Sequence, residues 1–370
     1  MAQQITYDKA YDAVGPEDFS AMLEVPRYGR RSDAFDGIIS ATHDHFWDPL
    51  DTKYIDFNDD FDADTTDFMP DELVPALMTD YVSNYFADKP AERIRFKSQT
   101  GRWIMSSILH GEQGALNLSA SLCHVLRDPG AQEYAANQTR EEGRHVTAFA
   151  KYIIARWGTP MPCGSVLADL LQEIVHAPEV YKKIIGMQML VEGLAMGAFA
   201  TIFKEWNDPL AKKLTQLVMT DEAFHHKFGK IWADRTIPKL SPEEHEIVEN
   251  WAAHCFQTLL FNLVAPHQMT AIYHEFGLDP DKVHFQRHSW DIRDLTQGRT
   301  DAMSGYAPVE PFQLEALGTR VSLLRPVDYG VDFYGDCLFT TDAEDRKHPA
   351  RVRAVRRAVL KGWTYALEHP

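Results

Sequence analysis

Apolar residues recur at helical spacing through most of the middle of the chain. From about Glu72 to Leu278 they follow a period of three to four residues, and the β-branched alternation typical of strands is scarce. Short segments rich in Pro and Gly interrupt this pattern and predict the ends of long helices. The middle of the chain is therefore predicted to be an all-α body. We expect its breaks at residues 87–92, 127–132, 157–164, 207–211 and 237–244, with Ser241 and Glu244 forming a capping box after the last break.

The pattern changes on both sides of this body. The N-terminal segment is rich in Asp and aromatic residues without a helical period, so we expect it to wrap the body with its acids in solvent. After about Asp294, short apolar runs alternate with Gly and Pro, as in alternating strands and helices. We predict a wrapping segment at 1–70, a helical domain at 71–292 and a small α/β segment at 293–370.

Charge and cysteine content narrow the class of protein. A net charge of −17 disfavours nucleic acid and anionic membrane surfaces as partners. The four cysteines are far apart in sequence, which argues against a thiolate metal site and against a disulfide framework. We find neither a signal peptide pattern nor an apolar run of about 18 residues. These features predict a protein of the reducing cytoplasm.

Three Glu-x-x-His motifs carry the candidate chemistry, and a geometric test separates them. Residues equally distant from the turn of a helical hairpin lie at the same height. The turn at Arg127 lies fifteen residues from both Glu112 and Glu142, and Asn207 lies fifteen residues from both Glu192 and Glu222. Each hairpin therefore places a lone glutamate opposite a Glu-x-x-His motif. The third motif, Glu173 with His176, has no such partner, and we expect it to be structural.

The two hairpins are related by a constant shift of 80 residues, which also superimposes their Asp-Pro turns. We interpret this as a duplicated α-hairpin, and pairing the two copies predicts a four-helix bundle. Four carboxylates and two imidazoles would then face its core, an arrangement that binds two iron or manganese ions. Without cations, the buried carboxylates would repel one another strongly. The expected metal ligands, and through the metals the catalytic residues, are Glu112, Glu142, His145, Glu192, Glu222 and His225.

Two acids next to these ligands are assigned different roles. Asp221 precedes Glu222. We expect its carboxylate to orient the metal-bound imidazole of His145, which lies across the bundle. Glu141 precedes Glu142, and we expect it to face outward and to pair with Arg144.

Residues 101–236 resemble the ferritin-like di-iron carboxylate proteins, in the branch with bacterial multicomponent monooxygenases, acyl-carrier-protein desaturases and the ribonucleotide reductase small subunit. The segments "HGEQGALNLSA", "EEGRHV", "VEGLAMGAFATIFKEW" and "TDEAFHHKFG" carry this resemblance. It implies a ferritin-like bundle, a di-iron or Mn/Fe cofactor with O₂ as co-substrate, and oxidation of an organic molecule in an adjacent apolar pocket. The helices between Ser241 and Leu278 would supply walls of that pocket. An external electron donor, a reductase or a ferredoxin, is implied as well, and a homodimer is left open.

Three features of that family pattern are missing from this sequence. Phe149 stands where the reductase subunit has its radical tyrosine, which argues against a tyrosyl-radical generator. Ala195 and Met196 stand where many monooxygenases carry an oxygen-assisting threonine. Val218 stands where the arylamine N-oxygenases have an extra histidine. Hydroxylation, N-oxygenation and desaturation all remain open.

The segment from about Arg293 to the end resembles part of a solute-binding protein of the thiamine-precursor type. It is too short for the two lobes of such a protein, so we expect a fused fragment and carry over no ligand binding.

Two alternatives to an oxygenase remain. The first is an iron-oxidising or iron-storing ferritin-like protein, which needs only the four helices. The second is a helical interaction module without metal.

Overall fold

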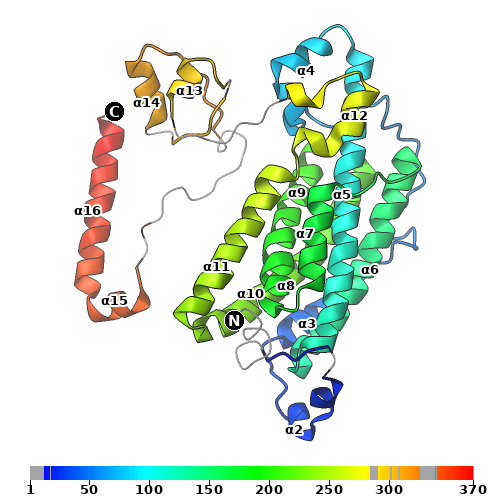
Figure 1. Cartoon of the computed structure of the whole chain (residues 1–370), viewed down its shortest axis with the longest axis vertical. Coiled ribbons are helices and arrows are strands. Elements are labelled where there is room, and N and C mark those ends of the chain that lie inside the picture. The colour runs from blue at the N-terminus through cyan, green and yellow to red at the C-terminus, as the bar shows by residue number, and fades with distance from the viewer. Residues whose placement is uncertain are drawn as a thin grey trace. The chain divides into compact units, whose positions relative to one another are not determined.

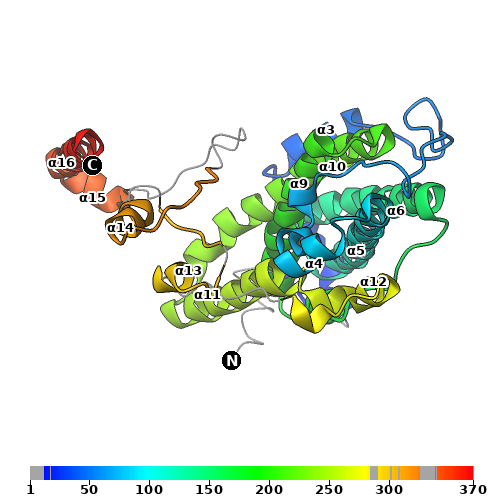
Figure 2. The same ribbon diagram turned by 90° about the horizontal axis from the view of Figure 1, so that it is seen from above.

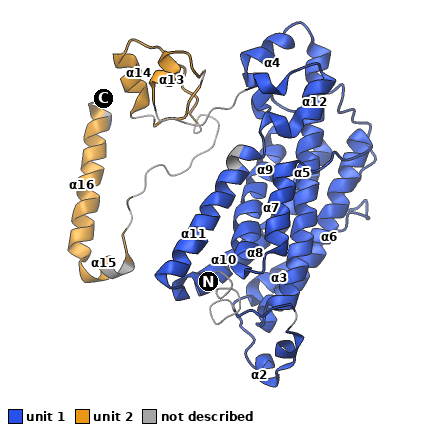
Figure 3. Ribbon diagram, viewed as in Figure 1, with its two compact units in different colours: residues 1–284 blue, residues 285–370 orange. Residues whose placement is uncertain are grey.

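The computed structural model describes residues 12–16, 18–283, 291–300, 302–306, 309–325, 338 and 340–369. The chain divides into two compact units, residues 1–284 and 285–370 (Figure 3). This division lies a few residues before the expected boundary at 292/293.

The described part of the chain is predominantly helical, as predicted (Figure 1). Within the described residues no β-strand occurs, and an isolated bridge joins Ala13 to Leu126. The longer helices of the first unit begin and end close to the expected breaks, and the Ser241 capping box is present. These helices are α5 (Pro90–Val125), α6 (Pro129–Trp157), α7 (Ser165–His176), α9 (Glu192–Glu205), α10 (Pro209–Thr236) and α11 (Pro242–Gln257).

The helices of the two hairpins pack in pairs. Helix α5 runs antiparallel to α6 and α9 antiparallel to α10, while α6 contacts α10 (Figures 1 and 2). Before α9 in the sequence, the short helix α8 (Val180–Lys183) continues into a π-helical segment, η4 (Ile184–Val191). This segment packs on α5 and α10. A second π-helical segment, η6 (Thr258–Asn262), follows α11. Neither π segment was predicted, because periodicity alone cannot distinguish i→i+5 from i→i+4 hydrogen bonding.

Residues 12–70 contribute short helices and a long irregular stretch to the first unit. The elements are η1 (Phe19–Leu23), α2 (Val25–Tyr28) and α3 (Asp36–Asp44), followed by 45–70 without a helix. Trp47, Ile55 and Phe68 on this stretch are buried, whereas most of its acids are exposed. These apolar residues thus anchor the segment to the helices.

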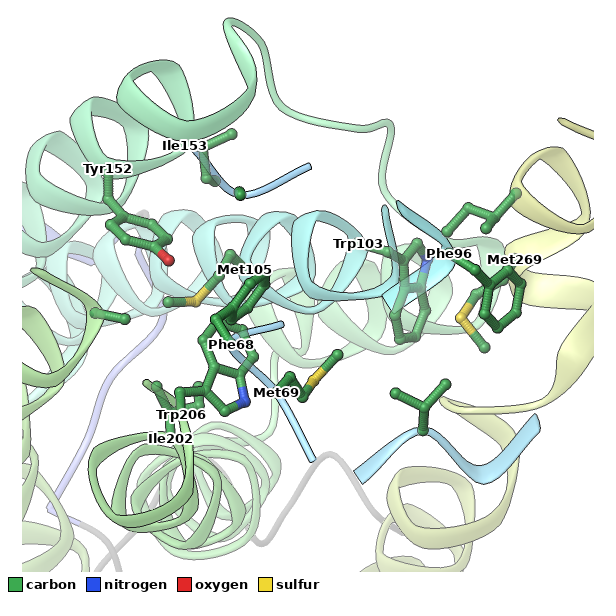
Figure 4. Close-up of a cluster of buried hydrophobic side chains, with 14 of the residues drawn as sticks. Phe68, Met69, Phe96, Trp103, Met105, Tyr152, Ile153, Ile202, Trp206 and Met269 are labelled. Atoms are coloured by element: carbon green, nitrogen blue, oxygen red, sulfur yellow. The ribbon is translucent and has the colours of Figure 1, made fainter. Parts of the chain in front are cut away.

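Between this segment and α5 lie η2 (Asp71–Leu73), η3 (Pro75–Met78) and α4 (Asp80–Tyr85). After α10 come η5 (Ile237–Lys239), η7 (Pro266–Met269), α12 (Thr270–Glu275) and η8 (Pro280–Lys282). The apolar cluster that joins η3, α4, η7 and α12 to α5 and α9 includes Phe68, Phe96, Trp103, Trp206 and Met269 (Figure 4).

The stretch Val180–Glu205 is long and apolar enough to cross a bilayer, by length and composition alone. This differs from the expectation of no such run, because Glu192 alone interrupts the uncharged sequence between Lys183 and Lys204. Core helices of water-soluble proteins pass the same test, and η4 and α9 pack against α10 here.

The second unit contains α13 (Arg293–Thr296), α14 (Glu310–Ala316), α15 (Asp342–Lys347) and α16 (Pro349–Glu368). The strands expected in 293–370 do not appear among its described residues. The pattern that suggested them runs over residues 298–341, and most of its later part, 326–341, lies outside the described residues, as does Cys337.

The duplicated Asp-Pro turns place both hairpins in register. Asp128 caps α6 by accepting from the Gly130 amide at 2.8 Å, and Asp208 caps α10 by accepting from the Leu210 amide at 2.9 Å. Asp208 is also fully buried and accepts from Tyr152 Oη and from Arg156 Nε, both at 2.7 Å.

We expect Asp208→Ala to cost about 3 kcal/mol of unfolding free energy, because it removes a cap and a buried partner of Arg156. Asp128→Ala, the matched cap of the other hairpin, should cost about 1 kcal/mol. Urea unfolding followed by circular dichroism measures both values. Equal losses of unfolding free energy in the two variants would show that the pair of Asp208 with Arg156 contributes nothing to stability.

Candidate metal centre

The six residues expected to be metal ligands meet in the core of the first unit. Glu112 comes from α5, Glu142 and His145 from α6, Glu192 from α9, and Glu222 and His225 from α10. All six are buried, with at most 6% of any residue exposed. Their ligand atoms form two groups, Glu112, Glu142, His145 and Glu222, and Glu142, Glu192 and His225, within which all atoms lie within 4.8 Å of one another.

Two carboxylates lie between the two imidazoles. Glu142 places Oε2 3.4 Å from His145 Nδ1 and Oε1 3.1 Å from His225 Nδ1. Glu222 places Oε1 3.2 Å from His145 Nδ1 and Oε2 3.4 Å from His225 Nδ1. Each carboxylate therefore offers one oxygen to each half of the cluster, as a bridging ligand of two metals would.

The other two carboxylates each belong to one half. Glu112 Oε2 lies 3.1 Å from His145 Nδ1. Glu192 is grouped with Glu142 and His225. One half thus has His145, Glu112, Glu142 and Glu222, and the other has His225, Glu192 and Glu142, with Glu222 Oε2 also near His225.

Each imidazole uses its second nitrogen to contact another buried carboxylate. Asp221 Oδ2 lies 2.9 Å from His145 Nε2, which is the contact expected from the sequence. Glu141 Oε2 lies 2.9 Å from His225 Nε2. A carboxylate in this position fixes the ring orientation and the tautomer that leaves Nδ1 free to bind a metal.

The expectation that Glu141 faces outward was wrong. Glu141 is 3% exposed, and its contact with Arg144, at 3.7 Å, is longer than its contact with His225. The sequence held the signal, because the 80-residue shift that relates the hairpins also places Glu141 on Asp221. A buried carboxylate needs a hydrogen-bond partner, and His225 provides it at 2.9 Å.

Asp221 has further partners from the wrapping segment and from α6. Trp47 Nε1 donates to Asp221 Oδ2 at 2.8 Å, and the indole stacks on the His145 ring with centroids 6.0 Å apart. Arg144 Nη2 donates to Asp221 Oδ1 at 2.6 Å. A buried cation and a buried indole therefore hold the carboxylate that contacts His145.

Gln138 was not identified from the sequence. Its fully buried side-chain amide donates to Glu142 Oε1 at 3.0 Å and to Glu192 Oε1 at 2.9 Å. Gln188 on η4 donates to its oxygen at 3.3 Å. Gln138 lies one helical turn before Glu142. Helical spacing alone does not show whether a residue at this position contacts the cluster or only packs in the core.

The charges of the cluster shift the pKa values of its members in opposite directions. Burial raises the pKa of Glu112 to about 8 and raises that of Glu192 well above its usual value. Burial opposes the charged forms of Glu142 and His145 too, but the attraction between the imidazoles and the carboxylates outweighs it. The pKa of Glu142 is consequently lowered and that of His145 is raised. Without a cation, the cluster balances its charge by retaining protons.

The donor atoms fit divalent metal ions. Glu142 Oε2, Glu192 Oε2 and His225 Nδ1 are buried and make no hydrogen bond within the described part of the chain. Such atoms are costly unless an unseen partner satisfies them. Oxygen and imidazole donors in two adjoining groups, without a thiolate, suit iron or manganese.

An apolar pocket of about 220 Å³ adjoins the cluster. Glu112, Glu192 and Glu222 line it, whereas the two histidines do not. Leu259, Leu263 and Val264 contribute from the region after α11, where the sequence predicted pocket walls. Met187 and Val191 of η4 line the pocket too, so both π-helical segments named above border it.

The other residues considered in the sequence analysis do not belong to the cluster. Glu173 is exposed and accepts from Trp251 Nε1 at 2.9 Å, and exposed His176 contacts the Gln172 carbonyl. Phe149 is fully buried and stacks on Phe199, and Val218 is a core residue. Ala195 lines the pocket.

Comparison with known proteins gives one family match. The family described as NMT1/THI5 like matches residues 261–370, less than a third of the chain. This agrees with the resemblance found for the C-terminal segment, but the match begins inside the first unit, about thirty residues before Arg293. A search of curated proteins found no match.

Because Glu141 contacts His225, we expect Glu141→Ala to lower the affinity of the cluster for Fe²⁺ by about 10- to 100-fold. Competition with a chromophoric chelator measures this affinity. Glu133→Ala removes an exposed carboxylate from the same helix and should leave the affinity unchanged. An unchanged affinity in Glu141→Ala would contradict the orienting role of this carboxylate.

Proposed function

We propose that the first unit is a ferritin-like four-helix bundle, formed by α5, α6, η4 with α9, and α10, that binds two iron ions or one manganese and one iron. We further propose that the chain is an O₂-activating oxidoreductase that hydroxylates, N-oxygenates or desaturates a small or medium organic molecule. The observation that supports this most strongly is the pair of similar half-sites, each with an imidazole whose second nitrogen contacts a buried carboxylate.

The ligands divide into three kinds in this proposal. Glu142 and Glu222 would contribute to both metal sites, because each presents one oxygen to each imidazole. Glu112 and His145 complete one site, and Glu192 and His225 complete the other. Asp221 and Glu141 hold the imidazoles in the orientation that directs Nδ1 at the metals.

Charge balance supports two divalent ions. Four ionised carboxylates carry the same charge, with opposite sign, as two divalent cations, so a filled site has no net charge from its ligands and metals. Ligands must lose protons to bind a metal. Glu112, with its pKa raised to about 8, would release its proton when a metal binds.

When reduced iron is bound, the metal pair supplies electrons to O₂ and oxidising power to a neighbouring substrate. The protein contributes the surroundings: the apolar pocket excludes water from the Glu112, Glu192 and Glu222 side, and the outer carboxylates fix the imidazoles. Repeated turnover requires electrons from outside, and a reductase or a ferredoxin is the expected donor. The proposal concerns the first unit and assigns no ligand to the second.

An iron-oxidising, ferritin-like function is the alternative. Such a function requires the metal centre and a path for iron. It gives no reason for an apolar pocket with three of the cluster carboxylates in its lining. The pocket therefore favours an organic substrate.

Removal of a bridging ligand tests the metal centre. We expect Glu142→Ala or Glu222→Ala to abolish tight binding of at least one of two metal ions, and Glu173→Ala to leave both bound. Elemental analysis of purified protein gives the stoichiometry, and circular dichroism confirms that each variant is folded. Equal metal loss in all three variants, or no transition metal in the unaltered protein, would contradict the proposal.

Oxygen chemistry separates the two functional classes. We expect protein loaded with two equivalents of Fe²⁺ to consume O₂ in a single turnover and to form an oxidised organic product from a small-molecule extract, detected by mass spectrometry. Continued oxidation of added Fe²⁺ to a ferric mineral, without an organic product, would instead establish the iron-oxidising function.

A further inference from the structure

The shape and lining of the pocket carry an inference about its ligand that rests on the proposed function. The pocket follows one face of α5, because Trp103, Ile104, Ser107, Ile108, Gly111 and Ala115 recur at helical spacing in its lining. Glu112 lies on the same face, about 13 Å from Trp103 along the helix axis at ~1.5 Å per residue. An elongated molecule would therefore lie along α5, with one end beside the cluster.

The lining offers nothing to a charged ligand. Among the described residues that form it there is no Lys, Arg or His, and apart from the cluster carboxylates and the Trp103 indole its polar group is the Ser107 hydroxyl. A carboxylate entering this pocket would lose its hydration and would find no cationic side chain in the lining. The pocket thus selects against anions.

The volume limits the size of the enclosed part. A dry cavity of about 150 Å³ holds benzene, which has six carbon atoms, so about 220 Å³ holds about nine non-hydrogen atoms. Leu194 and Val264 line the pocket and are 39% and 43% exposed, so the pocket reaches the surface there. A longer molecule can extend into solvent at this mouth.

We propose that the pocket binds a neutral, predominantly apolar molecule, such as a medium-length alkyl chain with an uncharged end group, and encloses about nine of its non-hydrogen atoms. Under the proposed function, the atom that is oxidised lies in the part of the bound molecule next to Glu112, Glu192 and Glu222. Anionic molecules of the same length bind weakly.

Gly111 allows a test that leaves the cluster residues unchanged. A Cβ atom built at Gly111 meets no other atom within 4 Å, although this residue lines the pocket. Gly111→Leu therefore fills pocket space without a clash at Cβ. Gly197→Leu is the matched control, because Gly197 is exposed on α9, has the same free space at Cβ and does not line the pocket. Both changes replace a helical glycine by a better helix former.

The experiment is calorimetric titration of the full-length protein with 1-alkanols and with octanoate. We expect the affinity for the alkanols to rise roughly fourfold for each added methylene group up to about nine non-hydrogen atoms, and to level off beyond that length. Octanoate should bind at least tenfold more weakly than octan-1-ol. Gly111→Leu should weaken octan-1-ol binding at least tenfold, and Gly197→Leu should not change it.

The outcome is independent of the oxidation chemistry. Repeating the titration after metal removal with a chelator should still show octan-1-ol binding that depends on Gly111, even if no metal or O₂ chemistry is found. Equal affinity for octanoate and octan-1-ol, or equal effects of the two glycine substitutions, would overturn the inference. A protein that consumes O₂ with bound iron but binds no alkanol would contradict the ligand class and leave the metal centre intact.

Discussion

The burial of four carboxylates and two imidazoles at one level of a helical core is the constraint on which the rest of this structure depends. Ionised groups without compensating partners would not be stable there. The protein reduces the cost by sharing protons within the cluster, by the Gln138 amide, and by Asp221 and Glu141 behind the imidazoles. These groups bring the donor atoms together, but Glu142 Oε2, Glu192 Oε2 and His225 Nδ1 still lack hydrogen bonds within the described part. The arrangement is therefore better suited to cations than to protons.

The sequence allowed much of this arrangement to be predicted, because two different signals agreed. Helical periodicity located the long helices, and the 80-residue shift fixed the relative height of Glu112, Glu142, Glu192 and Glu222 through the turns at Asp128 and Asp208. The same shift would have identified Glu141, had it been applied to the residue before the motif as well as to the motif itself.

Other features depend on tertiary contacts that leave no periodic signal. Trp47 reaches Asp221 from an irregular segment far away in sequence, and Gln138 resembles any polar residue of an amphipathic helix until its partners are known. The shift relates Gln138 to Val218 and Arg144 to Phe224, so the duplicated hairpins differ around the cluster. Duplication predicts what the two halves share, whereas the differences between the halves have to be observed.

The cluster also has two unlike sides. On one side, the histidines contact Asp221 and Glu141, and Arg144 and Trp47 close this region with charged and hydrogen-bonding groups. On the other side, Glu112, Glu192 and Glu222 border an apolar pocket that reaches the surface at Leu194 and Val264. π-Helical segments are rare and occur often at functional sites, and both η4 and η6 contribute to this second side. A reacting molecule needs space beside the cluster, so the glutamate side is where the proposed oxidation would take place.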